Sequence, residues 1–269
     1  GRTWTYSQLQ FEAEKIASAL RKMGVSKGDR VVLDMQNCPQ LVITHFAILR
    51  LDAVVVPVNP MNRMEELKHY ILDPDTKVAV TTADLAPELA AASNALEKNQ
   101  RLEHLLVTQF TDVFDAVHVG SDELPATWRD WLTTVHDMPL LEGGQVHAWA
   151  SAMQGDVALG PVTAQAEDLA VLPYTSGTTG LPKGCMHTHG TIMHNAMSSG
   201  LWASGTPENK CLCVVPMFHI TGMVSVMHAT IFLGASLILM PRWDRDLAGR
   251  LISKWKVTHW TNIPTMVID

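Results

Sequence analysis

The segment with the strongest chemical character is a loop rich in glycine, threonine and lysine, Tyr174-Thr-Ser-Gly-Thr-Thr-Gly-Leu-Pro-Lys-Gly184. Its glycines permit positive φ angles and close approach of the backbone to a ligand. Successive free backbone N–H groups in such a loop form an anion-binding nest, to which four hydroxyl groups and the ammonium group of Lys183 add further donors. The apolar run Leu169–Tyr174 directly precedes the loop and predicts a strand that would support it. These features together predict a polyphosphate-binding loop.

The order of residues in this loop disfavours two better known phosphate-binding patterns. A Walker A loop needs glycine, four residues, and then Gly-Lys-Ser/Thr. Here the residue five after Gly177 is Pro182, and Lys183 is followed by Gly184. The dinucleotide pattern Gly-x-Gly-x-x-Gly does not fit either. A P-loop NTPase or a dinucleotide-binding domain is therefore disfavoured, and a Gly/Thr-rich surface turn is the structural alternative.

A second segment places a histidine between a predicted strand and a predicted helix, Val215-Pro-Met-Phe-His-Ile-Thr-Gly222. His219 in that turn is a candidate for the acid-binding site, and its structural alternative is a histidine satisfied by the local backbone. The helix expected over Thr221–Phe232 carries the small residues Gly222, Ser225 and Ala229. Small residues there are compatible both with space for an acyl tail and with close helix packing.

Composition excludes several other classes of function. The chain has 269 residues, a net charge of −7 and a pI of about 5.9, so the basic surface of a nucleic-acid-binding protein is missing. Apolar runs long enough to span a bilayer are missing too. Four cysteines without a dense framework predict free thiols and a cytoplasmic setting. The spacing Cys185-x-His187-x-His189 resembles a metal site but has no fourth ligand nearby, which disfavours zinc.

The elements that must position these motifs follow an alternation of helix and strand. A capping-box pattern, Ser7 with Gln10, predicts the first helix, and further helices are expected over 39–51, 63–72, 84–98, 191–203 and 245–255. Predicted strands cover 30–35, 53–58, 77–81, 102–108, 169–174, 185–189, 211–215, 235–240 and 258–261. This alternation predicts a layered α/β fold with largely parallel sheets and flanking helices.

The alternation of helix and strand is interrupted over residues 109–165, which mix Asp, Gly, Pro and Trp without a sustained hydrophobic period. We expect a partly helical connection there, with a helix over 124–135. The series of strands in the first half is expected to close at 108. A boundary near 160 divides the chain into a first α/β region, 1–160, and a second region, 161–269, which holds the phosphate loop and the start of the acid site.

The loop Tyr174–Gly184 resembles the signature loop of the adenylate-forming superfamily. Other segments extend the resemblance over nearly the whole chain: Thr5–Leu9, Gly24–Val32, Ala53–Pro60 and Val215–Gly222. The form Pro-x-Phe-His-x-x-Gly at 216–222 resembles acyl- and aryl-CoA ligases, and fatty-acid–CoA ligases above all. The implied fold is the N-terminal domain of such an enzyme. Asp52 departs from the family, which usually has glycine there, and Cys185 stands where valine is common.

The resemblance implies an acid–thiol ligase. Such an enzyme joins a carboxylic acid to AMP from ATP, releases pyrophosphate, and transfers the acyl group to coenzyme A. It implies nucleotide binding by seven residues of the loop: Thr175, Ser176, Gly177, Thr178, Thr179, Gly180 and Lys183. Thr175 is also implied as a ligand of Mg²⁺. His219, Thr221 and Gly222 are implied to bind the acid and its adenylate, with His219 the one residue considered for a catalytic role.

The family's Tyr-Gly-x-Thr-Glu segment and terminal lysine domain find no match here, so we expect a fragment with half the site and negligible turnover alone. The expected partners are a small carboxylic acid, ATP and coenzyme A, with a homodimer left open. Two alternatives remain. One is an aryl-CoA ligase or another acyl-adenylating enzyme, and the other is a non-catalytic module that binds a nucleotide or an acyl group.

Overall fold

The central sheet of the computed structural model has seven strands among the described residues, 2–114, 124–175 and 181–268. Its order is β5-β4-β3-β1-β2-β6-β9. Neighbouring strands run parallel except β6 and β9, which are antiparallel. The strands are β1 (Arg30–Asp34), β2 (Val54–Pro57), β3 (Val78–Thr82), β4 (His104–Thr108), β5 (Gln145–Ala148), β6 (Leu169–Val171) and β9 (His187–Thr188).

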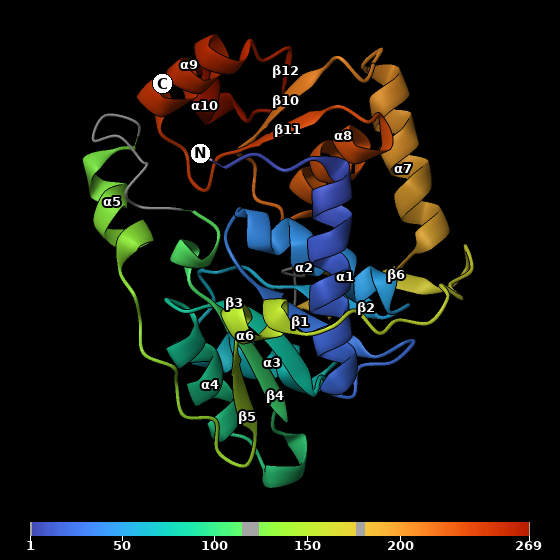
Figure 1. Cartoon of the computed structure of the whole chain (residues 1–269), viewed down its shortest axis with the longest axis vertical. Helices are drawn as coiled ribbons and strands as arrows, with labels where there is room; N and C mark the ends of the chain where they lie inside the picture. Colours follow the sequence, from blue (N-terminus) through green and yellow to red (C-terminus); the bar gives the residue numbers. More distant parts are fainter. Residues whose placement is uncertain (1, 115–123, 176–180, 269) are drawn as a thin grey trace.

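Two smaller sheets complete the strand architecture. β10 (Lys210–Cys213) lies between β11 (Ser236–Leu239) and β12 (His259–Trp260), and both pairings are parallel. β7 (Tyr174–Thr175) and β8 (Lys183–Gly184) form a two-stranded antiparallel ladder. Figure 1 shows the three-stranded sheet above the central sheet, with α7 (His189–Trp202) along one side of both. The predicted α/β fold with largely parallel sheets and flanking helices is confirmed.

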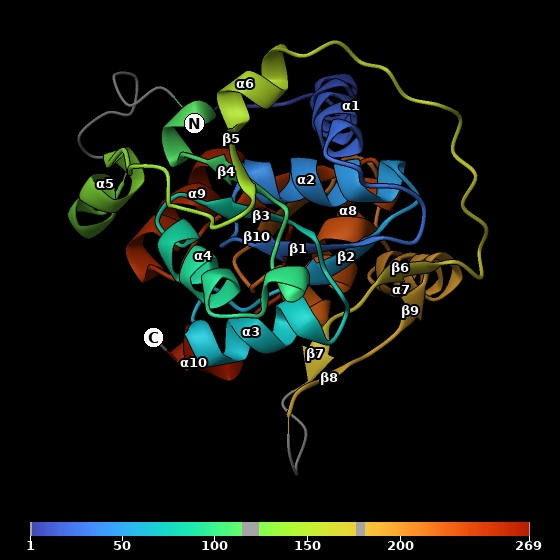
Figure 2. The ribbon, with the colours of Figure 1, turned by 90° about the horizontal axis from the view of Figure 1, so that it is seen from below.

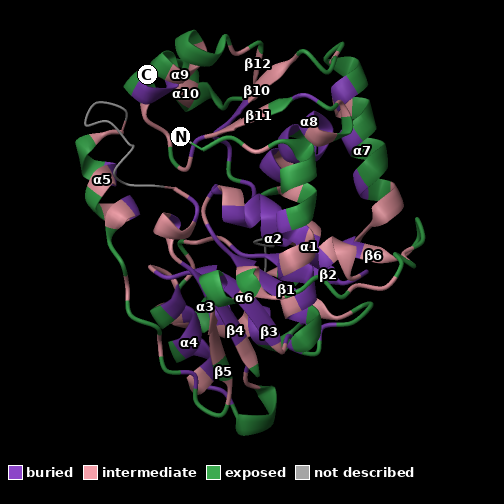
Figure 3. Cartoon of the chain, viewed as in Figure 1, coloured by how far each residue is buried: buried purple, intermediate pink, exposed green. Residues whose placement is uncertain are grey.

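Helices cover both faces of the central sheet. Alternate residues of β1 divide between two hydrophobic clusters: Val31 and Leu33 pack with the helices α1 and α2, whereas Val32 packs with α3 and α4. A parallel strand buried on both faces has this pattern, and Figure 3 shows the central strands buried. The helices are α1 (Tyr6–Lys22), α2 (Pro39–Arg50), α3 (Met64–Leu72), α4 (Ala86–Asn94), α5 (Ala126–Thr133), α6 (Trp149–Gln154), α7 (His189–Trp202), α8 (Ala229–Phe232), α9 (Arg245–Trp255) and α10 (Pro264–Ile268).

Short helices of other types occupy three connections: the 3₁₀ turns η1 (Lys98–Gln100) and η2 (Phe110–Asp112), and the π-helix η3 (Thr221–His228). The single helix predicted over 221–232 is therefore a π-helix followed by α8. Its end shows the wider winding directly, since the N–H of Ala229 donates to the carbonyl of Val224 five residues back. Residue spacing does not distinguish this winding from an α-helix over so short a segment.

Two other sequence predictions need correction. The first helix begins at Tyr6, because Thr5 and Gln8 form its capping box instead of Ser7 and Gln10. Both pairs have the required spacing, and the extended backbone of Thr5 decides between them. The strand series does not close at 108, because β5 adds a further parallel strand beside β4. β5 is a partly exposed edge strand without an apolar run, so its sequence carries little signal.

The change from one sheet to the next falls later than residue 160. Strands β6 and β9 still belong to the central sheet, and β10 is the first strand of the three-stranded sheet. The division of the domain into the sub-regions 1–160 and 161–269 stays a prediction. None of the helices in the described part of the chain is long and apolar enough to cross a membrane.

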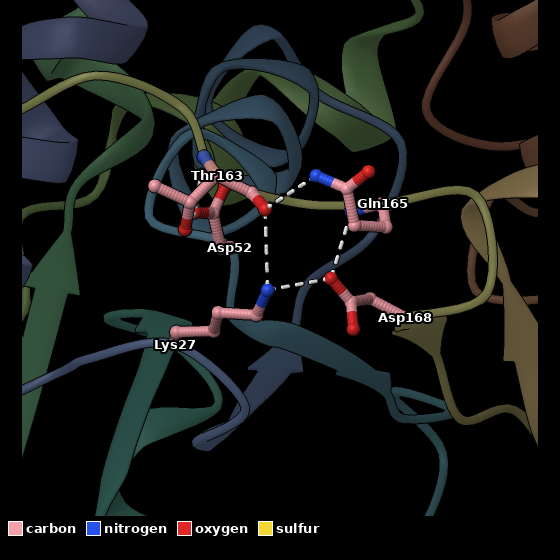
Figure 4. Close-up of polar contacts among 5 residues, drawn as sticks. All are labelled: Lys27, Asp52, Thr163, Gln165 and Asp168. Carbon is pink, nitrogen blue, oxygen red and sulfur yellow. Dashed lines mark hydrogen bonds and ion pairs between the residues drawn. The ribbon is translucent and has the colours of Figure 1, made fainter.

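A polar cluster attaches the connection before β6 to the body of the domain. Asp52 is buried, and its Oδ2 accepts bonds from the N–H and the hydroxyl of Thr163 at 2.7 and 2.6 Å. Lys27 Nζ donates to the Thr163 carbonyl and pairs with Asp168 at 2.6 Å, and Gln165 completes the group (Figure 4). The connection is thereby held against the turn between α2 and β2, immediately before the strand that leads to the phosphate loop.

Asp52 has a φ of 57°, a left-handed conformation that glycine adopts more readily. Replacing Asp52 with glycine relieves that strain but removes both bonds to Thr163, so we expect the free energy of unfolding to fall by about 1–2 kcal/mol. Asp52→Asn tolerates the same backbone and keeps an accepting oxygen, so its cost should stay below about 1 kcal/mol. Urea denaturation of the three proteins measures this, and a glycine variant as stable as the parent would contradict it.

Candidate functional site

Both predicted motifs follow the carboxyl ends of parallel strands. The phosphate loop begins three residues after β6, and the His219 turn, Val215–Gly222, begins two residues after β10. Ligands of open α/β sheets bind at this edge, where loops leave the strands. The two motifs lie on different sheets, so the way the sheets meet decides whether they belong to one site.

Asn37 joins the carboxyl ends of the two sheets. It follows β1 in the central sheet and is buried, with 4% of its surface exposed. Its Nδ2 donates to the carbonyl of Val215, 3.0 Å away, and its Oδ1 accepts the N–H of Met217 at 2.8 Å. Because these two residues begin the His219 turn, Asn37 brings the carboxyl edges of both sheets face to face. Sequence reasoning missed Asn37, although a polar residue between a buried strand and a proline-initiated helix was the available signal.

The described part of the phosphate loop is its base. Thr175 pairs with Lys183, and Tyr174 pairs with Gly184, in the β7–β8 ladder. The side chains of Thr175 and Lys183 are exposed, and Figure 2 shows the ladder projecting beyond the central sheet next to α3. The remaining predicted nucleotide-binding residues lie outside the described residues: Ser176, Gly177, Thr178, Thr179 and Gly180. The ladder holds the two ends of the loop together, so it presents a hydroxyl and an ammonium group on one open surface.

His219 is exposed in the turn before η3. Its backbone N–H donates to the Pro216 carbonyl at 3.2 Å, and its carbonyl accepts the N–H of Met223 at 3.0 Å. The ring atom Nδ1 accepts the N–H of Thr221 at 3.3 Å. A neutral imidazole that accepts at Nδ1 carries its proton on Nε2. The local backbone therefore fixes one ring nitrogen and leaves Nε2–H as the donor toward a ligand.

Gly222 is buried where the backbone doubles back on itself. A Cβ atom at this position would lie 2.6 Å from the carbonyl carbon of Pro216 and 2.7 Å from the oxygen of Val215. Backbone contacts this short cannot be relieved by rotating a side chain. Of the two other small residues in this segment, Ala229 is buried and Ser225 is exposed. Close packing therefore accounts for the glycine, and contact of Thr221 or Gly222 with an acid stays a prediction.

A pair of buried histidines fixes the far end of η3. His228 Nε2 lies 2.7 Å from His45 Nε2 on α2, and the two side chains are 7% and 1% exposed. One ring must donate and the other accept, so the contact requires at least one neutral imidazole. Burial lowers the pKa of His228 to about 4, with His189 adding to the effect. Burial, and then His228, also lower the pKa of His45 far below its ordinary value.

The structure thus places the two motifs on facing edges but in separate local networks. Among the described residues, no hydrogen bond joins the loop base to the His219 turn. Nor does the described part of the chain contain three His, Cys, Asp or Glu side chains grouped to hold a metal ion. The role of Thr175 as a ligand of Mg²⁺ stays a prediction.

Comparison with known proteins places the chain in one family. Residues 1–269 match the model of the AMP-binding enzyme family. A long-chain-fatty-acid–CoA ligase of Bacillus subtilis (strain 168) is 32% identical, over 100% of this chain and 47% of the relative. A 4-coumarate–CoA ligase of Oryza sativa subsp. japonica is 29% identical, over 100% and 44%. The chain therefore spans about half the length of these relatives.

Solved structures agree on the fold. The N-terminal domain of FACL13 from Mycobacterium tuberculosis superposes with a TM-score of 0.71 at 26% identity, covering 98% of this chain and 57% of that one. The anthranilate CoA ligase AuaEII, solved with anthranoyl-AMP, gives a TM-score of 0.76 at 24% identity, covering 98% and 46%. With a family match over the whole chain and the phosphate loop at the carboxyl end of β6, this chain belongs to the AMP-binding enzyme family.

Proposed function

We propose that the chain provides the phosphate loop and part of the acid site of an ATP-dependent acyl-CoA ligase whose acid is a fatty acid. The observation that carries the proposal is the Tyr174–Gly184 loop, set on a two-stranded ladder after β6 with Lys183 exposed. Family membership over residues 1–269 supports the reaction class. The free thiols of all four cysteines fit a cytoplasmic setting. A homodimer remains a prediction.

In the proposed reaction an oxygen of the carboxylate attacks the α-phosphorus of ATP, and the bond to pyrophosphate breaks. The sulfur of coenzyme A then attacks the acyl carbon and AMP leaves. Both steps depend on positioning and on neutralising charge. Lys183 and the hydroxyl of Thr175 would hold the phosphates that leave as pyrophosphate. His219 would donate its Nε2–H to the carboxylate, and Mg²⁺ would supply additional positive charge.

The identity of the acid rests on the relatives. The fatty-acid–CoA ligase of B. subtilis, at 32% identity, favours an alkyl chain. An aryl acid is the second candidate, because the 4-coumarate–CoA ligase of rice follows at 29%. The buried packing around Gly222 and Met223 does not discriminate between an alkyl acid and an aryl acid.

Replacing Lys183 with alanine should raise the Kd for ATP about 10- to 100-fold, because a charge-assisted bond to phosphate contributes roughly 1.5–3 kcal/mol. Titration of the protein with ATP and Mg²⁺ measures the change. Lys98→Ala, at an exposed lysine of η1, is the matched control and should bind like the parent. Equal affinity of the Lys183 variant and the parent would contradict the role of the loop.

The acid is tested by ATP–pyrophosphate exchange in the full-length protein that contains this chain. Saturated fatty acids of graded length and hydroxycinnamic or aminobenzoic acids are compared at equal concentration. Exchange that depends on fatty acids is the expected result. Exchange with aromatic acids alone would show that the substrate is an aryl acid and not a fatty acid. ATP binding without exchange for any acid would favour a non-catalytic module.

A further inference from the structure

The end of helix α3 contacts the chain on both sides of the phosphate loop. His69 lies in the last turn of α3, and Asp73 is the residue that caps the C-terminal end of the helix. The backbone of Asp73 is still helical, and the two residues stand four apart, so their side chains lie on the same side of the helix end. One reaches the segment that returns from the loop, and the other reaches the segment that enters it. Figure 2 shows α3 alongside the projecting ladder. The motif predicted from the sequence, Tyr174–Gly184, does not include this helix.

The contact with the returning segment is a hydrogen bond from a ring to the backbone. His69 Nε2 donates to the carbonyl oxygen of Pro182 at 2.7 Å, and both residues are half-buried. Proline has no N–H of its own with which to join a ladder. The bond from His69 therefore fixes the backbone at the residue directly before Lys183.

The contact with the entering segment combines a hydrogen bond with ring packing. The Tyr174 hydroxyl donates to Asp73 Oδ2 at 2.5 Å, and its ring lies 4.5 Å from that of Tyr70, centre to centre. The His69 ring meets Tyr174 edge-on at 5.6 Å. Burial, followed by the bond to Asp73, raises the pKa of Tyr174, so the hydroxyl keeps its proton and remains a donor.

The helix itself is firmly held. Leu67, Tyr70 and Ile71 are almost completely buried in the hydrophobic cluster on that face of the sheet, and Leu172, two residues before the loop, joins them. A side chain on a helix anchored in this way has a defined position. The polar face of α3 can therefore act as a fixed reference for the loop base.

We propose that His69 and Asp73 are positioning residues, which hold the two ends of the phosphate loop against α3 and so place Lys183 and Thr175 for the nucleotide. The inference rests on the proposed function for its consequence in ATP binding. The effect on the structure does not depend on that function. Loss of the His69 bond frees the backbone at Pro182 and Lys183, whether or not a nucleotide binds there.

The direct test is the rate at which trypsin cleaves the folded chain after Lys183 under native conditions. Mass spectrometry measures how fast the intact chain disappears. His69→Ala should speed this cleavage about fivefold to tenfold, because loss of one partly buried hydrogen bond is worth roughly 1 kcal/mol or slightly more. His69→Gln places an amide nitrogen near the position of Nε2 and should restore the parental rate. His194→Ala, at an exposed histidine of α7, is the matched control.

Tyr174→Phe provides a second variant that keeps the ring packing and removes only the bond to Asp73. It should also speed cleavage after Lys183, and Asp73→Asn, which keeps an accepting oxygen, should not. Urea denaturation verifies that each variant is folded. Unchanged cleavage in both His69→Ala and Tyr174→Phe, or failure of His69→Gln to restore the rate, would overturn the inference.

A second measurement separates this inference from the proposed function. Inorganic pyrophosphate should slow cleavage after Lys183 in the parent, and in His69→Ala about tenfold more pyrophosphate should be needed for the same protection. In the full-length enzyme the same variant should raise KM for ATP and leave KM for the acid unchanged. Faster cleavage of His69→Ala with no protection of the parent by pyrophosphate would retain the positioning role and reject the phosphate site.

Discussion

Replacing Gly222 with alanine is expected to lower the free energy of unfolding by about 3 kcal/mol or more. The added methyl group would meet backbone atoms of Val215 and Pro216 at distances that a real Cβ atom does not reach. Relief requires the turn before η3 to move, and this turn is tied to the central sheet through Asn37. Overpacking with no side chain free to rotate belongs among the strongly destabilising substitutions.

The chain offers a matched control for this substitution. Gly249 lies within α9, and a Cβ atom there would meet no heavy atom within 4 Å beyond its chain neighbours and the backbone of its own helix. Gly249→Ala should therefore be neutral or stabilise by up to about 1 kcal/mol, because alanine favours helix more than glycine does. Urea denaturation of both variants measures the difference. A Gly222 variant as stable as the parent would mean that the close backbone approach at this turn is wrong.

The second large effect is a loss of stability in mild acid caused by the His45–His228 pair. The unfolded chain titrates these rings near pH 6.5, whereas in the folded chain burial lowers the pKa of His228 to about 4 and that of His45 also far below its usual value. Below pH 6.5 the unfolded chain therefore binds more protons than the folded chain. The stabilisation is complete above that pH and is lost as the pH falls toward 4.

The size of the effect follows from the number of protons involved. Each histidine that is protonated only on unfolding reduces the free energy of unfolding by about 1.4 kcal/mol per pH unit. The pair should give about twice that slope at pH 5 to 6. Other groups face these rings as well: the ring of Phe46 packs against both, and His189 on α7 lies near His228. With two protons taken up on unfolding, the free energy of unfolding of the parent should fall by about 2–3 kcal/mol between pH 6 and pH 5.

Denaturation with urea at a series of pH values measures the slope. The double variant His45→Leu, His228→Leu should have a much flatter profile than the parent. Asp34 acts in the opposite direction, since burial raises its pKa, but it is present in both proteins and cancels in their difference. His104 and His147 form a second pair that is only partly buried, so replacing both with glutamine should change the slope far less. Parallel profiles for the parent and the leucine variant would contradict the prediction.

Much of the fold could be predicted from the sequence because its signals are local. Each of β1 to β4 is a short apolar run between turn residues, and each lies where the run predicted it, to within two residues at its ends. The phosphate loop could be proposed as a candidate site for the same reason, since glycines, hydroxyls and one lysine stand together in eleven residues. The elements that were missed or displaced, β5 and the π-helix, have weak local signals because neighbours across the structure determine their form.

The sequence by itself determined the fold class and the family resemblance and supplied the candidate residues for a nucleotide, because these depend on residue type and short-range spacing. Only the tertiary structure decided which distant residues support them. Asn37 meets Val215 across 178 residues, His45 meets His228 across 183, and His69 meets Pro182 across 113. Such pairs have no periodicity or fixed spacing. They arise because parallel strands place their carboxyl ends along one edge and because helices on the sheet faces bring remote polar side chains within hydrogen-bonding distance.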